Sequence, residues 1–401
     1  MTRIVYAGGR VFDGTGADPF TADVAVADGL IAEVGTGLDG DEVVDVAGAT
    51  VLPGFIDCHV HVLASAMDEL KLLHQPFSYQ FYDAVTNLRK TLHAGVTTAR
   101  DAGGADLGVQ RALEHGLIPG PRLQISITIL SQTGGHGDGW LPSGAISDIF
   151  GPHPGRPDGV VDGPDEMRRA ARQLIRAGAQ VLKVCTTGGV LSPLDDPRHS
   201  QFGIDEIEVL TAEAAAQGRY VMAHAQGADG IKNAVRAGVR SIEHGIYADD
   251  EAIALMVEHG TYLVPTMVAP IAVIRAAESG VPLPVAVVDK ARDAAAAHLD
   301  TVRRAHQAGV RIAMGTDSGV GPHGTNLEEL PLMAAAGMSP AQVLASTTSV
   351  AASLLGWGDT LGRIEPGFAA DLLVVDGDPY DLDTLPSRLR TVVQAGRPVA
   401  R

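Results

Sequence analysis

The chain carries two histidines, His59 and His61, at the end of the apolar run 52–61. If that run is a β-strand, both side chains leave the same face, because side chains alternate along a strand. Imidazole and carboxylate groups are good ligands for Zn²⁺ and its neighbours, and a catalytic site keeps one position open for water. Four further residues lie within or at the ends of other apolar segments: Lys183, His224, His244 and Asp317. Together these residues predict a metal site.

The apolar segments that would position these side chains are predicted as eight strands. They are residues 54–61, 96–101, 122–130, 181–187, 220–225, 239–244, 261–266 and 311–317. Most follow a helix-like stretch that ends in an Ala-Gly turn, as in LRKTLHAGV and VRRAHQAGV. A glycine after the last helical turn, followed by a buried strand, is typical of parallel βα units. We therefore predict an α/β fold, a (β/α)8 TIM-type barrel, whose active site lies at the C-terminal ends of the strands.

The two ends of the chain follow a different pattern. Residues 1–53 contain short alternating segments separated by glycine turns, and the C-terminal residues 362–401 contain the apolar strand ADLLVVD. Such alternation is typical of short β-strands. We predict a small β-sandwich domain built from residues 1–53 and 362–401, and a catalytic barrel over residues 54–361.

The amino-acid composition indicates which classes of molecule the protein does not bind. The chain has 48 acidic and 30 basic residues, a net charge of −18, which repels nucleic acid and anionic membranes. Cys58 and Cys185 are too few for a disulfide framework, and the N-terminal residues lack the apolar region of a signal peptide. No apolar run reaches the ~20 residues of a spanning helix. We predict a cytoplasmic protein that acts on a small molecule and binds neither nucleic acid nor a membrane.

Each candidate ligand also has a purely structural interpretation. A lone histidine at a strand end is usually packed or solvated, and Lys183 could be a barrel lysine paired with a carboxylate. Several of the 14 histidines lie in helix-like stretches, where we expect only a structural role: His74, His93, His115, His259, His298 and His306. Six suitable residues at the ends of five predicted strands nevertheless favour one common site.

The Gly/Pro-rich segment 131–164 is too long for a simple connection and is predicted as an active-site loop. It contains His136 and Trp140. Trp140 is a candidate to line a pocket for an apolar or aromatic part of the substrate.

Several of these motifs resemble the amidohydrolase superfamily, and the resemblance covers essentially the whole chain. PGFIDCHVH is similar to its first-strand His-x-His motif, MGTDSG to its eighth-strand aspartate, and LGRIEPGFAADLLVVDGDPYD to its return to the small β-domain. The resemblance implies two divalent ions, Zn²⁺ or else Mn²⁺, Co²⁺ or Fe²⁺. It assigns His59, His61 and Asp317 to the first ion, His224 and His244 to the second, and Lys183, carboxylated on its Nζ, to the bridge between them.

The implied reaction is hydrolysis of an amide bond by a hydroxide that bridges the two ions, with Asp317 passing a proton to the leaving nitrogen. Three segments resemble the prolidase-like branch of the superfamily: SQTGGHGD, TGGVLSPLDDPRHSQF and AHAQG. That branch implies Xaa-Pro or other dipeptides, or N-acyl amino acids, as substrates. Homo-oligomers are implied by the same resemblance.

Four further residues are candidates for binding the substrate. His136 could polarise the scissile carbonyl or could stabilise its loop. Tyr247 could donate to the same oxygen or could pack in the core. Arg198 and His199 could hold a substrate carboxylate, since a guanidinium matches that geometry, or could be a solvated pair. Gln226 stands where many relatives carry a second histidine, which leaves side-chain specificity open.

Rival functions remain at this stage. An imidazolonepropionase-like hydrolase of cyclic amides, or a hydrolase of carbamates, phenylureas or other amide xenobiotics, would use the same metal chemistry, because loops change specificity on one scaffold. A deaminase of this superfamily typically carries a glutamate where this chain has Gly227. A non-catalytic scaffold would have lost ligands, whereas this chain has kept all six.

Overall fold

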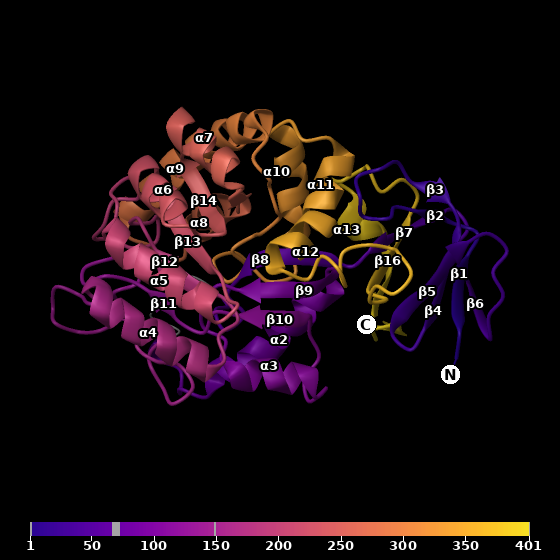
Figure 1. The fold of residues 1–401 in the computed structure, drawn as a ribbon, viewed down its shortest axis with the longest axis horizontal. Helices are drawn as coiled ribbons and strands as arrows, with labels where there is room; N and C mark the ends of the chain where they lie inside the picture. The colour runs from indigo at the N-terminus through magenta and orange to yellow at the C-terminus, as the bar shows by residue number, and fades with distance from the viewer. Residues whose placement is uncertain (1, 66–72, 148–149, 401) are drawn as a thin grey trace.

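The computed structural model describes residues 2–65, 73–147 and 150–400 (Figure 1). The two ends of the chain together form two sheets. The first has the order β5-β4-β1-β6. Its strands are β1 (Ile4–Ala7), β4 (Asp23–Ala27), β5 (Leu30–Gly35) and β6 (Glu42–Asp45). The second sheet has the order β18-β17-β16-β7-β2-β3. Its strands are β2 (Arg10–Val11), β3 (Phe20–Thr21), β7 (Ala49–Pro53), β16 (Leu372–Asp376), β17 (Leu389–Gln394) and β18 (Arg397–Pro398).

Apolar side chains from both terminal sheets form one cluster. Val24 of β4 and Val51 of β7 share it with Leu372 of β16, and all three are fully buried. β16 pairs with β7 in antiparallel register, Leu373 opposite Leu52. The C-terminal strand therefore completes a sheet begun by the N-terminal residues, as Figure 1 shows at its right side.

The middle of the chain is built from parallel strands. One sheet has the order β10-β9-β8 and the other the order β11-β12-β13-β14-β15. The strands are β8 (Phe55–Val60), β9 (Val96–Asp101), β10 (Arg122–Ile125), β11 (Ile129–Leu130), β12 (Leu182–Cys185), β13 (Val221–Gly227), β14 (Ser241–Tyr247) and β15 (Tyr262–Val264). They alternate with helices, so the prediction of an α/β fold is confirmed.

Two predicted strands are irregular. The segment 122–130 is divided into β10 and β11, because Ile127 has a φ of +71°, which regular pairing does not accommodate. The segment 311–317 is not a regular strand. It makes isolated parallel bridges, Leu263 with Ile312 and Val60 with Ser318, and the Cys58 amide donates to the Met314 carbonyl at 2.9 Å. This segment therefore joins β15 to β8, the outermost strands of the two parallel sheets.

Helices surround the parallel strands (Figure 1). They are α2 (Tyr79–His93), α3 (Leu107–Glu114), α4 (Gly163–Ala177), α5 (Ile204–Ala216), α6 (Ala228–Arg236), α7 (Asp250–His259), α8 (Val268–Glu278), α9 (Val285–Ala308), α10 (Glu329–Ala335), α11 (Pro340–Ser346), α12 (Ser349–Leu355) and α13 (Leu385–Arg388), with the 3₁₀ turn η1 (Asn326–Glu328). Gly178 and Gly309 end α4 and α9 in the left-handed conformation, which a residue without Cβ adopts at low cost. Within the described residues, no helix has the length and apolarity to cross a bilayer.

Candidate metal centre

His59, His61 and Asp317 meet at the C-terminal end of β8. Asp317 Oδ1 lies 3.4 Å from His59 Nε2 and 3.3 Å from His61 Nε2. His244 joins this group, because ligand atoms of His59, His244 and Asp317 all lie within 4.8 Å of one another. The period-two spacing of His59 and His61 thus brings both rings to one carboxylate, as the sequence predicts.

Backbone strain accompanies this arrangement. His244, Thr266 and Asp317 have φ values of +70°, +55° and +58°. Non-glycine residues rarely adopt this region, and such strain is concentrated at functional sites. The positive φ at Asp317 also explains why the eighth segment is not a regular strand where its carboxylate turns toward the histidines.

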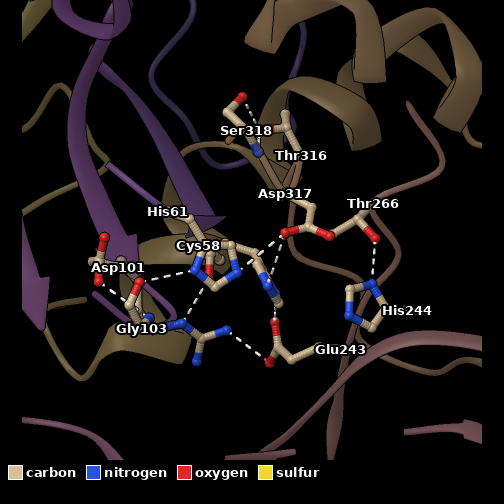
Figure 2. A network of polar contacts seen from close by, with 12 residues as sticks. Cys58, His61, Asp101, Gly103, Glu243, His244, Thr266, Thr316, Asp317 and Ser318 are labelled. Atoms are coloured by element: carbon tan, nitrogen blue, oxygen red, sulfur yellow. Dashed lines mark hydrogen bonds and ion pairs between the residues drawn. The ribbon is translucent and has the colours of Figure 1, made fainter. Parts of the chain in front are cut away.

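A neighbouring group orients His59, His61 and His244, and Figure 2 labels the last two beside their partners Gly103 and Thr266. His59 Nδ1 lies 2.7 Å from Glu243 Oε2, and His61 Nδ1 lies 2.9 Å from the Gly103 carbonyl. His244 Nδ1 lies 2.7 Å from Thr266 Oγ1. These contacts leave the Nε2 atoms of all three rings for the site. Metal-binding histidines usually have this arrangement, in which the second ring nitrogen is held by the protein.

His224, on β13, is oriented the other way. Its Nε2 lies 3.1 Å from the Gly188 carbonyl, so Nδ1 is the nitrogen left for a ligand. Its ring is 4.7 Å from that of His244. Burial lowers the pKa of His59, His224 and His244 well below the usual histidine value, and Lys183 lowers each further. These rings are therefore neutral near pH 7, the form that binds metal.

Lys183 is 2% exposed within β12, on the strand beside His224. Burial lowers the pKa of its amine, which the negative charge of Glu243 opposes. Across residues 2–65, 73–147 and 150–400, its Nζ has no hydrogen bond or ion pair. Lys183 lines the same cavity as the ligand-type histidines and Asp317.

Asp317 provides the clearest test of whether these residues suit a metal. Burial acts to raise the pKa of its carboxyl, but His59, His61 and Lys183 together hold that pKa below its usual range. Its Oδ1 is buried and has no hydrogen bond in the described part of the chain. Burial acts to lower the pKa of His61, but the Asp317 carboxylate in turn raises it overall, so the carboxylate favours positive charge at this point, which a divalent ion would supply.

His136 lies above this group, in the loop after β11. Its ring stacks on His224 with centroids 4.3 Å apart, and its Nδ1 lies 3.3 Å from Asp195 Oδ2. The residue lines a cavity of about 750 Å³ that also includes His59, His61, Lys183, His224, His244 and Asp317. The structure therefore brings His136 and all six predicted ligands to one cavity.

The remaining walls of the cavity are mainly apolar. Side chains from the loops after β11 and β12 and from the α8–α9 connection contribute Trp140, Ile146, Phe150, Leu191, Leu194 and Leu283. Trp140 is therefore beside the cavity, as expected. In the described residues, Lys183 is the only lysine or arginine on the cavity wall.

The structure places Arg198, His199 and Tyr247 differently. Arg198 and His199 are exposed, and neither lines the cavity. The Arg198 guanidinium lies 4.2 Å from the centre of the Tyr247 ring. Tyr247 does not line the cavity either, although its hydroxyl is buried without a partner in the described structure. A carboxylate-binding role for Arg198 and His199 has no geometric support here, and a loop pair is the better interpretation.

Sequence reasoning missed the residues that hold the ligands in place. Glu243 is fully buried, and its second oxygen pairs with the buried guanidinium of Arg100 at 2.9 Å. A charged residue inside the apolar segment 239–244 was the available signal. His298 of α9, expected to be only structural, contacts the His244 carbonyl at 2.9 Å through Nε2. No local pattern marks that contact.

Comparisons with known proteins agree with this geometry. Ochratoxinase from Aspergillus niger is 34% identical over 399 residues, which cover 94% of this chain and 82% of the fungal protein. A solved prolidase in complex with N-methylphosphonate-L-proline is 37% identical, with a TM-score of 0.91 and 100% coverage of both chains. A solved Xaa-Pro dipeptidase with methionine in its active site is 33% identical, with the same TM-score and coverage.

These relatives imply a TIM-barrel fold of the α/β class. The profile of the amidohydrolase family matches residues 50–399, from β7 to the C-terminal sheet, and so spans every residue of the candidate metal centre. The chain belongs to the amidohydrolase family.

Proposed function

We propose that this protein is a binuclear metal-dependent amidohydrolase that cleaves the amide bond of Xaa-Pro or other dipeptides, or of N-acyl amino acids. The observation that carries this proposal is the convergence on one cavity of His59, His61, Lys183, His224, His244 and Asp317. Membership of the amidohydrolase family supports hydrolysis of an amide bond. The prolidase and dipeptidase relatives support the narrower substrate class.

The proposal includes the architecture. Residues 54–361 are the (β/α)8 barrel, with the irregular segment 311–317 as its eighth strand, and residues 1–53 with 362–401 are the small β-sandwich. The parallel bridges of Ile312 and Ser318 to the two flanking strands support closure of the barrel.

Two divalent ions fit the residues present. His59, His61 and Asp317 would hold one, His224 and His244 the other, and Lys183, once carboxylated on Nζ, would bind both. Burial favours the neutral amine of Lys183, which is the form that reacts with CO₂. Bound there, such a pair of ions would acidify a water molecule and polarise the substrate carbonyl.

Side chains of the protein would then transfer the proton and bind the substrate. Asp317, ionised and buried, accepts the proton of the attacking water and passes it to the departing nitrogen. His136, at the rim of the cavity, donates from Nε2 to the scissile carbonyl. The Tyr247 hydroxyl is buried and unpartnered in the described structure, and it would act as a second donor only if substrate binding brought it to the cavity, which it does not line here. The apolar wall, which includes Trp140 and Phe150, suits a bulky apolar acyl group or side chain.

A second candidate function follows from the same wall. Because Lys183 is its only lysine or arginine among the described residues, a free carboxylate finds no cationic side chain beside the candidate metal site. This favours neutral amides, such as cyclic amides, carbamates or phenylureas, as the alternative substrate class.

A substrate panel separates the two. Protein reconstituted with Zn²⁺ and bicarbonate is assayed on Xaa-Pro dipeptides, other dipeptides, N-acyl amino acids, cyclic amides, carbamates and phenylureas. Release of a C-terminal amino acid would support the dipeptidase or N-acyl amino acid hydrolase. Turnover confined to neutral amides would support the second candidate function instead. No turnover of any panel substrate by protein that holds two ions per chain would contradict both functions.

A further inference from the structure

We propose that Lys290 and Asp195 are positioning residues for His136, holding the loop 187–202 so that the imidazole faces the substrate carbonyl. The inference rests on the proposed function, because that function assigns the carbonyl contact to His136. Lys290 lies on α9, far along the chain from both the loop and the metal-type residues.

Lys290 fastens this loop from outside. Its Nζ donates to the carbonyls of Gly189 at 2.7 Å, Ser192 at 2.5 Å and Asp195 at 2.9 Å. A lysine ammonium has three N–H donors, so one loop takes all of them. The side chain is only 17% exposed, although it lies on a helix of the outer layer. A single side chain thus binds three carbonyls of the loop to α9.

Asp195 lies between Lys290 and the imidazole of His136 and contacts both. One oxygen lies 3.3 Å from His136 Nδ1, and the other lies 3.5 Å from Lys290 Nζ. Both oxygens also accept from the Gly189 amide, at 3.2 and 3.3 Å. Burial raises the pKa of the Asp195 carboxyl, but the nearby His136, the Gly189 amide and the charge of Lys290 lower it overall, so the group is ionised. An ionised acceptor at this place orients the Nδ1 edge of the ring toward Asp195 and turns the Nε2 edge toward the cavity, so Nε2, when it carries a proton, can donate to the substrate carbonyl.

The surroundings of His136 leave its ring little freedom. The backbone amide of His136 donates to Gln201 Oε1 at 3.0 Å, and the ring stacks on His224 at 4.3 Å. A Cβ on Gly189 would come within 2.2 Å of the ring, so the ring packs directly on that backbone. Groups from two separate segments, the loop 187–202 and β13, therefore enclose His136, which is more than a solvated loop histidine requires.

The competing explanation is that Lys290 only shapes the apolar wall, since Val190 and Leu191 belong to the same loop and line the cavity. In that case substrate affinity would change, while the orientation of His136 and the chemical step would not. The two explanations therefore predict different kinetic and spectroscopic results.

The experiment compares Lys290→Met, Lys290→Arg and Asp195→Asn with wild type, all reconstituted with Zn²⁺ and bicarbonate. Lys232→Met is the matched control, because Lys232 is 12% exposed and contacts Asp229, Asp249 and Glu251 away from the cavity. The readouts are zinc per chain, amide hydrogen exchange over residues 187–202, ¹⁵N spectra of labelled histidine, and kcat and KM on the best panel substrate. The His136 signal is assigned by its loss in His136→Gln.

We expect unchanged zinc content and faster exchange in Lys290→Met. His136 should lose its Nδ1-protonated signal in Lys290→Met and in Asp195→Asn. The expected fall in kcat is about 10- to 100-fold with little change in KM, as for a misplaced catalytic group. Lys290→Arg should recover part of both effects, because a guanidinium also donates to several carbonyls, and Lys232→Met should match wild type.

An unchanged His136 signal in both variants, or a higher KM with unchanged kcat, would overturn the proposal in favour of the wall-shaping role. Loss of zinc would overturn it as well, since the effect would then pass through the metal. If wild type hydrolyses no panel substrate, the proposed function fails separately, and the histidine spectra still decide whether Lys290 and Asp195 hold the ring.

Discussion

The carboxylate of Glu243 lies 2.7 Å from Nδ1 of His59 and joins that imidazole to the buried guanidinium of Arg100. All three side chains are at most 1% exposed. The Arg100 Nε also donates to the Cys58 carbonyl at 2.6 Å, so the network returns to the strand that carries His59 (Figure 2). His59 is thus held in place by the ion pair of Glu243 and Arg100, and neither of these two residues lines the cavity.

Glu243→Gln should weaken metal binding. The change removes the negative charge that makes His59 a better ligand, and outer partners of metal ligands typically contribute about 10- to 100-fold in affinity. Zinc dissociation constants from chelator competition would measure the loss. Glu213→Gln, a surface glutamate paired with Arg168 and Arg172, is the control and should bind zinc like wild type. Equal affinity for the two variants would contradict the role of Glu243.

Asp317→Asn should lower kcat while the fold is retained. The amide keeps the shape of the carboxylate but cannot accept the proton of the attacking water, a step that contributes about 10²- to 10⁴-fold in rate. Steady-state kinetics on the best panel substrate measure the change, and circular dichroism with thermal melting checks the fold. A variant as fast as wild type would remove Asp317 from the mechanism.

Lys183→Ala should bind less metal than wild type, because the proposed bridging group is lost. Lys183→Met keeps most of the buried volume and separates loss of the ligand from a packing defect. Metal analysis after reconstitution, with and without bicarbonate, is the measurement. Full metal content in Lys183→Met would show that Lys183 is not a ligand.

Gly189→Ala should displace the His136 ring. The new Cβ would lie 2.2 Å from a ring carbon, a distance that real Cβ atoms do not tolerate, so the imidazole must move. We expect a fall in kcat of about 10-fold or more at unchanged zinc content. Gly35→Ala is the control, because its Cβ would meet only the flexible end of Leu38 at 3.3 Å. Wild-type kinetics for Gly189→Ala would contradict the proposed place of His136.

Glu329 should make the folded state less stable as the pH rises. Burial raises the pKa of this carboxyl to about 8, while its oxygens accept from the Met267 and Val268 amides. Between the unfolded value of 4.5 and about 8 the folded chain binds the extra proton, so the free energy of unfolding falls across that window as pH increases. Urea unfolding of metal-free protein at pH 5 and pH 8 measures the slope. Glu329→Gln should have a smaller slope, and an equal slope would exclude Glu329 as its source.

The sequence alone was sufficient to predict the six ligand-type residues, His136 and Trp140 as members of one site, and all of them line the cavity. His59 and His61 alternate with Val60 on β8, so the period of a strand places both rings on one side. The glycines that end α4 and α9 marked the helix boundaries because few other residues adopt the left-handed conformation there. Such features depend on neighbours within a few positions, and local patterns record them.

Only the tertiary structure decided how these residues are held and what surrounds them. Glu243 is 184 positions from His59, and Lys290 is 101 positions from Gly189. The irregular course of 311–317 depends on bridges to β8 and β15, and the exposure of Arg198 and His199 depends on how their loop folds back. Contacts of this kind arise when distant segments pack around one core, so no local spacing encodes them. For this protein, the order of residues indicates which side chains could bind a metal, whereas the tertiary fold decides where those side chains lie.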